Sequence, residues 1–237
     1  MATIDALLEE IFQDKKPVFY REFEGWVRDS RRFSAFAHDY RYKIRSKLRN
    51  AGDDESLQDL RAELETAALL LGERRFAVAY ETYAALKQRG PDFTVTYKTH
   101  TPFNVEVRRL RGGEAAEGER EGGGESRSGK LMAVLCDKVG QMPPSIVNFL
   151  WLIAEGEISE EELSGAVAAL RRLAEGKEEA YFTRRGFAGA AAFLRQLRRL
   201  SGIVLRQAGE NVLWLNPMAQ HKAPPEIGRV LERLGRG

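Results

Sequence analysis

The chain has 237 residues, of which 43% are hydrophobic and 30% are charged, a composition typical of a globular domain. The formal net charge is only +2, which excludes binding of nucleic acid through overall charge and requires any basic surface to be local. The single cysteine, Cys136, excludes an intrachain disulfide and a zinc site made of thiolates.

Residues 1–52 are predicted to form an amino-terminal helical segment. Two sets of apolar residues recur at helical spacing. They are Leu7, Leu8, Ile11 and Phe12, and then Phe33, Phe36, Ala37, Tyr40, Ile44 and Leu48. The first twelve residues lack the apolar stretch of a signal peptide, and the longest apolar run, Ile146–Ala154, is too short to cross a bilayer. We therefore expect a cytoplasmic protein without a membrane partner, which also agrees with the lone cysteine.

Residues 53–155 are predicted to form an α/β (α+β) core. Residues 57–71 have helical periodicity, with Ser56 as the expected N-cap. Residues 75–80 resemble a strand, and the runs 93–97 and 103–107 alternate apolar and polar residues like the two strands of a hairpin. A helix over 130–139 and a continuous apolar strand over 146–153 complete the order helix, three strands, helix, strand, which predicts a mixed central sheet flanked by helices.

Residues 112–129 interrupt this core with a segment rich in glycine and glutamate. It contains no apolar residue larger than alanine, so it cannot bury enough surface to offset the entropy of ordering. We expect a mobile insert at this position.

Residues 156–237 are predicted to form a carboxy-terminal extension of helices and a hairpin that packs on the core. Ser159 and Glu162 have the spacing of a capping box at the start of one helix. Further helices are expected over 187–200 and 225–234, and residues 203–206 and 212–215 flank a turn as a hairpin would.

The residues best suited to chemistry lie on the predicted central hairpin. Asp92 opens one strand after Gly90-Pro91, whereas Glu106 and Arg108 share one face of the next strand because side chains alternate along a strand. Two adjacent carboxylates suit a Mg²⁺ or Mn²⁺ ion, which can activate water and neutralise charge on a reacting phosphate. The alternative is that Asp92 caps a turn while Glu106 and Arg108 form a solvated pair.

The run Pro91-Asp92 followed by Glu106-Val107-Arg108, together with the αβββαβ order, resembles the PD-(D/E)xK (restriction-endonuclease-like) nuclease superfamily. The resemblance covers about residues 57–153. It implies a metal-dependent endonuclease with Asp92 and Glu106 as ligands of Mg²⁺ or Mn²⁺, and a homodimer as one candidate assembly.

The resemblance also implies further site residues. An acid is expected on the first core helix, where Glu65 is our first choice and Glu63 the second. The family's usual lysine is Arg108 here, which keeps the positive charge but cannot lose its proton. Lys98 or Lys138 could supply an amine from another position.

Two arginine-rich stretches are candidates for contact with DNA phosphates. The first contains Arg41, Arg45 and Arg49, which share a helix face, and the second contains Arg195, Arg198 and Arg199. Our main hypothesis is a metal-dependent nuclease that hydrolyses DNA in restriction, repair or mobile-element processing. The alternative is a catalytically silent nuclease-fold module that binds nucleic acid or a partner protein.

Overall fold

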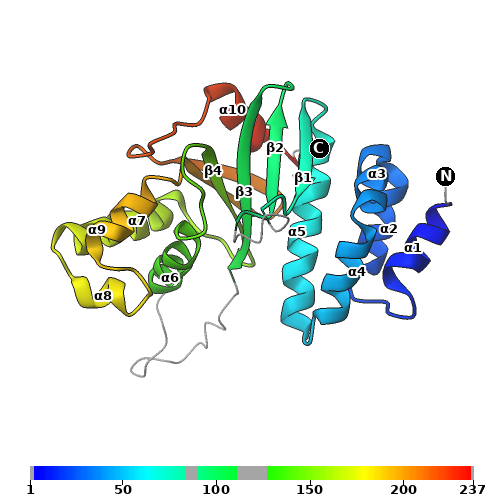
Figure 1. The fold of residues 1–237 in the computed structure, drawn as a ribbon, viewed down its shortest axis with the longest axis horizontal. Helices are drawn as coiled ribbons and strands as arrows, with labels where there is room; N and C mark the ends of the chain where they lie inside the picture. The colour runs from blue at the N-terminus through cyan, green and yellow to red at the C-terminus, as the bar shows by residue number, and fades with distance from the viewer. Residues whose placement is uncertain (1–2, 84–89, 111–126, 236–237) are drawn as a thin grey trace.

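The computed structural model describes residues 3–83, 90–110 and 127–235. A six-stranded mixed sheet lies between two groups of helices, with α1 to α5 on one side and α6 to α9 on the other (Figure 1). This arrangement confirms the predicted mixed α/β class with a helix-flanked sheet. None of the described helices has the length and apolar character needed to cross a membrane.

Four short helices form the amino-terminal part, as the apolar periodicity predicts. They are α1 Ile4–Phe12, α2 Tyr20–Asp29, α3 Arg31–Asp39 and α4 Arg41–Asn50. Arg32 ties them to the rest of the chain, because its guanidinium donates hydrogen bonds to the carbonyl oxygens of Leu71, Glu73 and Phe76.

The long helix α5, Asp54–Gly72, follows them and covers the sheet. Its N-cap is Asp53, whose carboxylate accepts a hydrogen bond from the Ser56 amide at 2.7 Å. The prediction of Ser56 as the cap is therefore wrong, because Asp53, three residues earlier, accepts the amide hydrogen that Ser56 itself donates.

The six strands lie in the sheet in the order in which they occur along the chain. They are β1 Phe76–Tyr80, β2 Phe93–Tyr97, β3 Thr101–Leu110, β4 Val147–Ala154, β5 Gly202–Gln207 and β6 Glu210–Leu215. The pairs β1–β2, β2–β3 and β5–β6 are antiparallel, whereas β3–β4 and β4–β5 are parallel. Both predicted hairpins are confirmed, and the carboxy-terminal one extends the same sheet.

The remaining helices correct two predicted boundaries. They are α6 Arg127–Val139, α7 Glu160–Glu175, α8 Glu179–Thr183, α9 Ala190–Leu197 and α10 Pro225–Arg233. The last three residues predicted for the mobile insert, 127–129, are the first turn of α6, and the insert's residues 112–126 lie outside the described residues. The helix predicted over 187–200 is shorter because Gly189, at φ 145°, cannot continue a helix toward its amino terminus. The capping box of Ser159 and Glu162 is confirmed.

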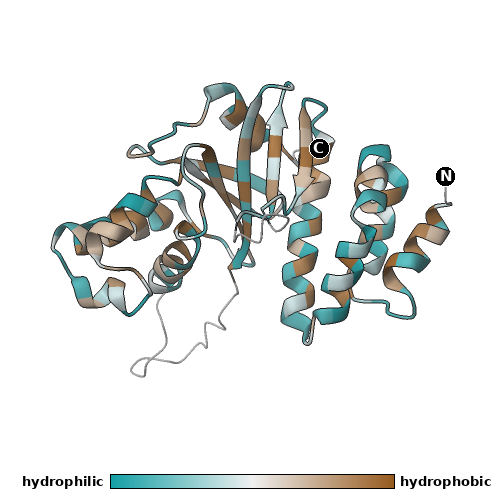
Figure 2. Cartoon of the chain, in the orientation of Figure 1, coloured by the Kyte–Doolittle hydropathy of each residue, from teal (hydrophilic) through white to brown (hydrophobic). Residues whose placement is uncertain are grey.

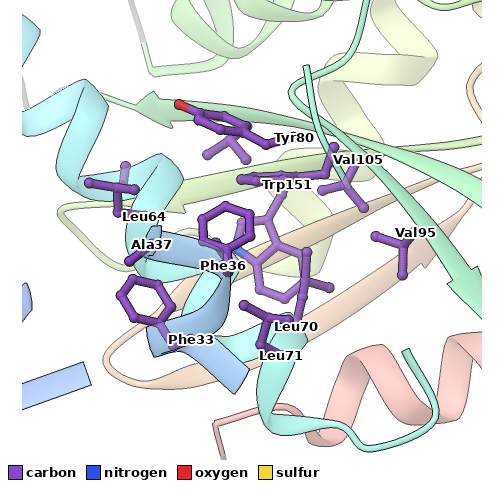
Figure 3. Close-up of a cluster of buried hydrophobic side chains, with 14 of the residues drawn as sticks. Phe33, Phe36, Ala37, Leu64, Leu70, Leu71, Tyr80, Val95, Val105 and Trp151 are labelled. Carbon is purple, nitrogen blue, oxygen red and sulfur yellow. The ribbon is translucent and has the colours of Figure 1, made fainter. Parts of the chain in front are cut away.

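The sheet separates two apolar clusters. One fills the space between the sheet, α1 to α5 and α10, and Figure 3 shows its centre, where Phe36, Leu70 and Trp151 meet. The other lies between the opposite face and α6 to α9, and it contains Leu150 and Leu152. β4 is therefore buried on both faces, as its continuous apolar run predicts. Figure 2 shows that the helices carry both hydrophobic and hydrophilic sides, as this layering requires.

Candidate functional site

The pairing of β2 with β3 brings Asp92 beside Glu106. Phe93 is paired with Val105, so Asp92, one residue before Phe93, faces Glu106, one residue after Val105. The Val107 amide donates a hydrogen bond to Asp92 Oδ2 at 2.8 Å. This hydrogen bond holds the Asp92 carboxylate against β3, so its position is explained without a role as a turn cap.

Glu106 is buried, with 3% of the residue exposed, because α6 covers this face of β3. Lys138, in the last turn of α6, places Nζ 2.6 Å from Glu106 Oε1. Burial raises the pKa of Glu106, and the charge of Lys138 only partly offsets that effect. Glu106 is thus part of a buried ion pair, which contradicts the alternative of a solvated pair with Arg108.

Glu63, on α5, is the helix-borne acid of this region. Its Oε2 accepts a hydrogen bond from the Tyr80 hydroxyl and lies 2.6 Å from Lys47 Nζ, which comes from α4. Burial and then the negative charge of Glu63 raise the pKa of Tyr80 well above its usual value, so Tyr80 stays a hydrogen-bond donor.

Glu81, directly after β1, completes the group. Its backbone adopts φ 47°, a left-handed conformation that few non-glycine residues adopt, and its amide donates a hydrogen bond to the Asp92 carbonyl at 2.6 Å. The Glu81 carboxylate lies 2.6 Å from Lys47 and 3.2 Å from Lys43. Burial opposes ionisation of Glu81, but these lysines outweigh it and lower the pKa. We call Glu63, Glu81, Asp92 and Glu106 the carboxylate cluster.

Asp92 is the member of this cluster with the greatest electrostatic strain. Within the described residues it forms no ion pair, whereas each of the other three carboxylates contacts a lysine. Burial raises the pKa of Asp92 well above its usual value, and the charges of Glu63 and Glu106 raise it further. A further positive charge beside Asp92 would relieve this repulsion.

The chemistry of the cluster fits a hard divalent cation, since Mg²⁺ binds one or two carboxylates and keeps several waters. Asp92 and Glu106 are the pair that could hold it, and Glu63 lies near enough for its charge to raise the pKa of both. The described residues do not contain three or more acidic, histidine or cysteine side chains already spaced around a metal position. Glu63, Glu81 and Glu106 are instead each held by a lysine at 2.6 Å.

A buried amide keeps the strand around Glu106 in place. Asn104, two residues before Glu106 on the same face of β3, donates hydrogen bonds to Asn148 Oδ1 and to the Tyr83 hydroxyl. Its own oxygen accepts a hydrogen bond from Thr94. Hydrogen bonds to three neighbours restrict the side chains next to the cluster.

Two of the predicted site residues lie away from the cluster. Arg108 is half-exposed, and Nη1 lies 3.9 Å from Asp59 Oδ2, beyond the amino-terminal turn of α5. Glu65 pairs with Arg206 at 3.1 Å, on the side of α5 that faces β5. The structure therefore brings Glu63, our second choice, into the electrostatic neighbourhood of Asp92 and Glu106 and does not bring Glu65 there.

The other lysine candidate, Lys98, also lies away from the cluster. It follows β2 at the end opposite Asp92 and is exposed. Of the two amines named from the sequence, Lys138 is the one that contacts a cluster carboxylate.

The arginines predicted to contact DNA fall into two groups. Arg41 Nε lies 3.0 Å from Glu10, and Arg45 donates to the Glu10 carbonyl, so both are engaged with α1. Arg195 and Arg198 are exposed on and directly after α9. Arg199 donates to the Met142 carbonyl, just beyond α6, which places this second group beside the helix that carries Lys138.

Sequence reasoning missed Glu81 as a member of the carboxylate cluster, and Lys43 and Lys47 as its ion-pair partners. Lys43 and Lys47 are one helical turn apart and alternate with arginines in the basic run of α4, and that spacing is the only local signal. Nothing in the sequence shows that this face of α4 meets Glu63 and Glu81.

Comparison of the chain with protein-family models, with curated proteins and with solved structures finds no match. The carboxylate cluster and the topology that builds it are therefore the features from which a function is inferred.

Proposed function

We propose that this protein is a divalent-metal-dependent nuclease that hydrolyses DNA phosphodiester bonds, with Asp92 and Glu106 as ligands of Mg²⁺ or Mn²⁺. The observation that supports it most is the β2–β3 pairing, which places Asp92 against Glu106 with a repulsion that a cation would relieve.

The topology gives independent support. The succession α5, β1, β2, β3, α6, β4, with an antiparallel meander followed by a parallel strand, is the order implied by the resemblance to PD-(D/E)xK nucleases. In that order the two ligands come from neighbouring strands, and the helices on either side contribute Glu63 and Lys138.

Each side chain has a distinct part in this proposal. A bound divalent cation would supply water activation and neutralisation of charge on the phosphate. Asp92 and Glu106 would hold it, and Glu63 takes the assisting role first given to Glu65, through a water or as a further ligand. Arg108, whose contact with Asp59 at 3.9 Å is weak, would turn toward the scissile phosphate and stabilise its charge.

DNA is the proposed partner, bound through phosphate contacts. Arg195 and Arg198 are exposed, and the neighbouring Arg199 donates a hydrogen bond to the Met142 carbonyl in the loop after α6. This group is therefore more accessible to phosphates than Arg41 and Arg45. Arg49, at the end of α4, is also exposed.

The test is a cleavage assay on duplex, single-stranded and branched DNA, and on RNA, in Mg²⁺, Mn²⁺ or EDTA. Asp92→Asn and Glu106→Gln keep the shape of each side chain and should lower the cleavage rate by about 100-fold or more, since each removes a ligand charge. Glu73→Gln, which lies outside the cluster, should leave the rate unchanged. Equal cleavage by all three variants, or cleavage in EDTA, would contradict the proposal.

The second candidate is a silent nuclease-fold module that binds nucleic acid or a partner protein. Two observations favour it: Arg108 stands where the family has lysine, and Lys47 and Lys138 already neutralise Glu63 and Glu106. Folded protein that binds DNA equally well in EDTA and in Mg²⁺, and that cleaves none of the substrates, would support this module instead.

A further inference from the structure

The carboxylate cluster receives lysines from two helices outside the β2–β3 hairpin. Lys47 comes from α4, in the amino-terminal helices, and Lys138 comes from α6 on the other face of the sheet. Their side chains are 28% and 13% exposed, and each nitrogen lies 2.6 Å from a cluster oxygen. These are close, partly buried ion pairs, which salt screens less than pairs on the surface.

An ammonium group and a divalent cation compete for the same carboxylate oxygens. Lys47 contacts one oxygen of Glu63 and one of Glu81, and Lys138 contacts one of Glu106. A lysine carries its charge on a flexible four-carbon chain, so it can leave a carboxylate without movement of the helix.

We propose that Lys47 and Lys138 hold the carboxylate cluster in the metal-free protein, and that metal entry releases them to bind the phosphate of an incoming DNA strand. The inference rests on the proposed function. It adds that the amino-terminal helices contribute a substrate-binding residue to the site. It also couples metal and phosphate binding, since each ligand favours the arrangement that the other needs.

The surroundings of Lys47 allow this exchange. Lys43 lies 3.2 Å from Glu81, so Glu81 keeps an ion pair when Lys47 leaves. Tyr80 still donates to Glu63 and keeps that carboxylate oriented. The Glu81 amide still donates its hydrogen bond to the Asp92 carbonyl oxygen.

The first test measures Mn²⁺ affinity by calorimetry, in wild-type protein and in Lys47→Met, Lys138→Met and Lys98→Met at pH 8. Loss of a competing ammonium should tighten Mn²⁺ binding by about fivefold or more in the first two variants. Lys98→Met removes the same charge at the far end of β2 and should leave the affinity unchanged. Lys47→Arg keeps the cation at the cluster and should retain the wild-type affinity.

A second test uses the unmodified chain and does not depend on the folding of a variant. The amines are acetylated briefly with and without Mg²⁺, and each lysine is quantified by mass spectrometry. Mg²⁺ should increase the modification of Lys47 and Lys138 and leave that of Lys98 unchanged. A short DNA duplex that cannot be cleaved should then protect both amines again.

The outcomes separate this inference from the proposed function. In one outcome, Asp92→Asn abolishes Mn²⁺ binding but neither lysine variant tightens it. That result supports the metal site and overturns the exchange. The absence of any Asp92-dependent binding overturns both. Lysines whose modification does not respond to Mg²⁺, in a protein that binds the ion, also overturn the exchange.

Discussion

Asp92 and Glu73 are both carboxylates near the ends of strands, yet their surroundings shift their pKa values in opposite directions. Hydrogen bonds from Arg75 lower the pKa of Glu73 to about 2, because they outweigh the opposing effect of burial. Burial and two like charges raise that of Asp92. The ionised form of Glu73 therefore stabilises the fold, whereas the ionised form of Asp92 opposes it, as is common for groups retained for function.

This difference predicts how Asp92→Asn changes stability with pH. Because folding raises the pKa of Asp92, the stability linked to its protonated form is fully present below the unfolded pKa of about 3.9 and is lost as pH rises through the folded pKa. Asparagine keeps an acceptor for the Val107 amide and removes the charge. We expect the free energy of unfolding to rise by about 0.5–2 kcal/mol at pH 7.5, with the gain shrinking toward pH 4. Urea unfolding across this range measures it.

Glu73→Gln is the control for that experiment. Folding lowers the pKa of Glu73, so its contribution is present above the unfolded pKa of about 4.3 and is lost as pH falls through about 2. The variant should be less stable than wild type at pH 7.5 and approach it in acid. The same pH trend in both variants would contradict the assigned environments.

At the scale of elements, sequence patterns predict those strands and helix caps that depend only on residues nearby in the chain. The alternation in 93–97 and 103–107 predicts β2 and β3, and the spacing of Ser159 and Glu162 predicts the start of α7. The cap of α5 and the start of α9 were mispredicted for local reasons, at Asp53 and Gly189. The position of an acid relative to the sheet depends instead on other elements. Helical periodicity cannot separate Glu63 from Glu65, because the choice is made by Tyr80 and Lys47 on other elements.

The capping box of α7 gives a prediction at this scale. Ser159→Ala removes the acceptor for the Glu162 amide and should lower the free energy of unfolding by about 1 kcal/mol. Ser164→Ala makes the same change inside α7, where alanine is the better helix former, so it should be neutral or slightly stabilising. Thermal unfolding of the two variants compares them, and equal destabilisation would argue against a role for the cap.

At the scale of the whole molecule, a net charge of +2 means that the proposed binding of DNA would depend on local basic surfaces. The sequence identifies two arginine groups but not which of them is available. Arg41 and Arg45 both contact Glu10, whereas Arg195 and Arg198 are exposed. Which arginines can contact phosphate therefore depends on tertiary contacts.

The charge distribution predicts the salt dependence of DNA binding. Arg195→Ala and Arg198→Ala should each weaken binding and reduce the slope of log K against log salt by about 0.9, the value for one lost phosphate contact. Arg171→Ala, on α7, is a control because Arg171 pairs with Glu175 at 3.2 Å. Fluorescence anisotropy between 50 and 200 mM salt, roughly the range over which such contacts are lost, measures the slopes. Unchanged slopes in the α9 variants would place the DNA elsewhere.

The two apolar clusters differ in how their residues are distributed along the chain, and this has a consequence during synthesis. The cluster beneath α6 to α9 draws its buried residues from Leu110 to Leu205, so it can assemble once that stretch has left the ribosome. The other cluster begins at Leu7 and closes with Leu231 and Leu234 on and after α10. That core is therefore complete only after α10 has been synthesised, so its apolar surface stays open to solvent for longer during synthesis than that of the first cluster.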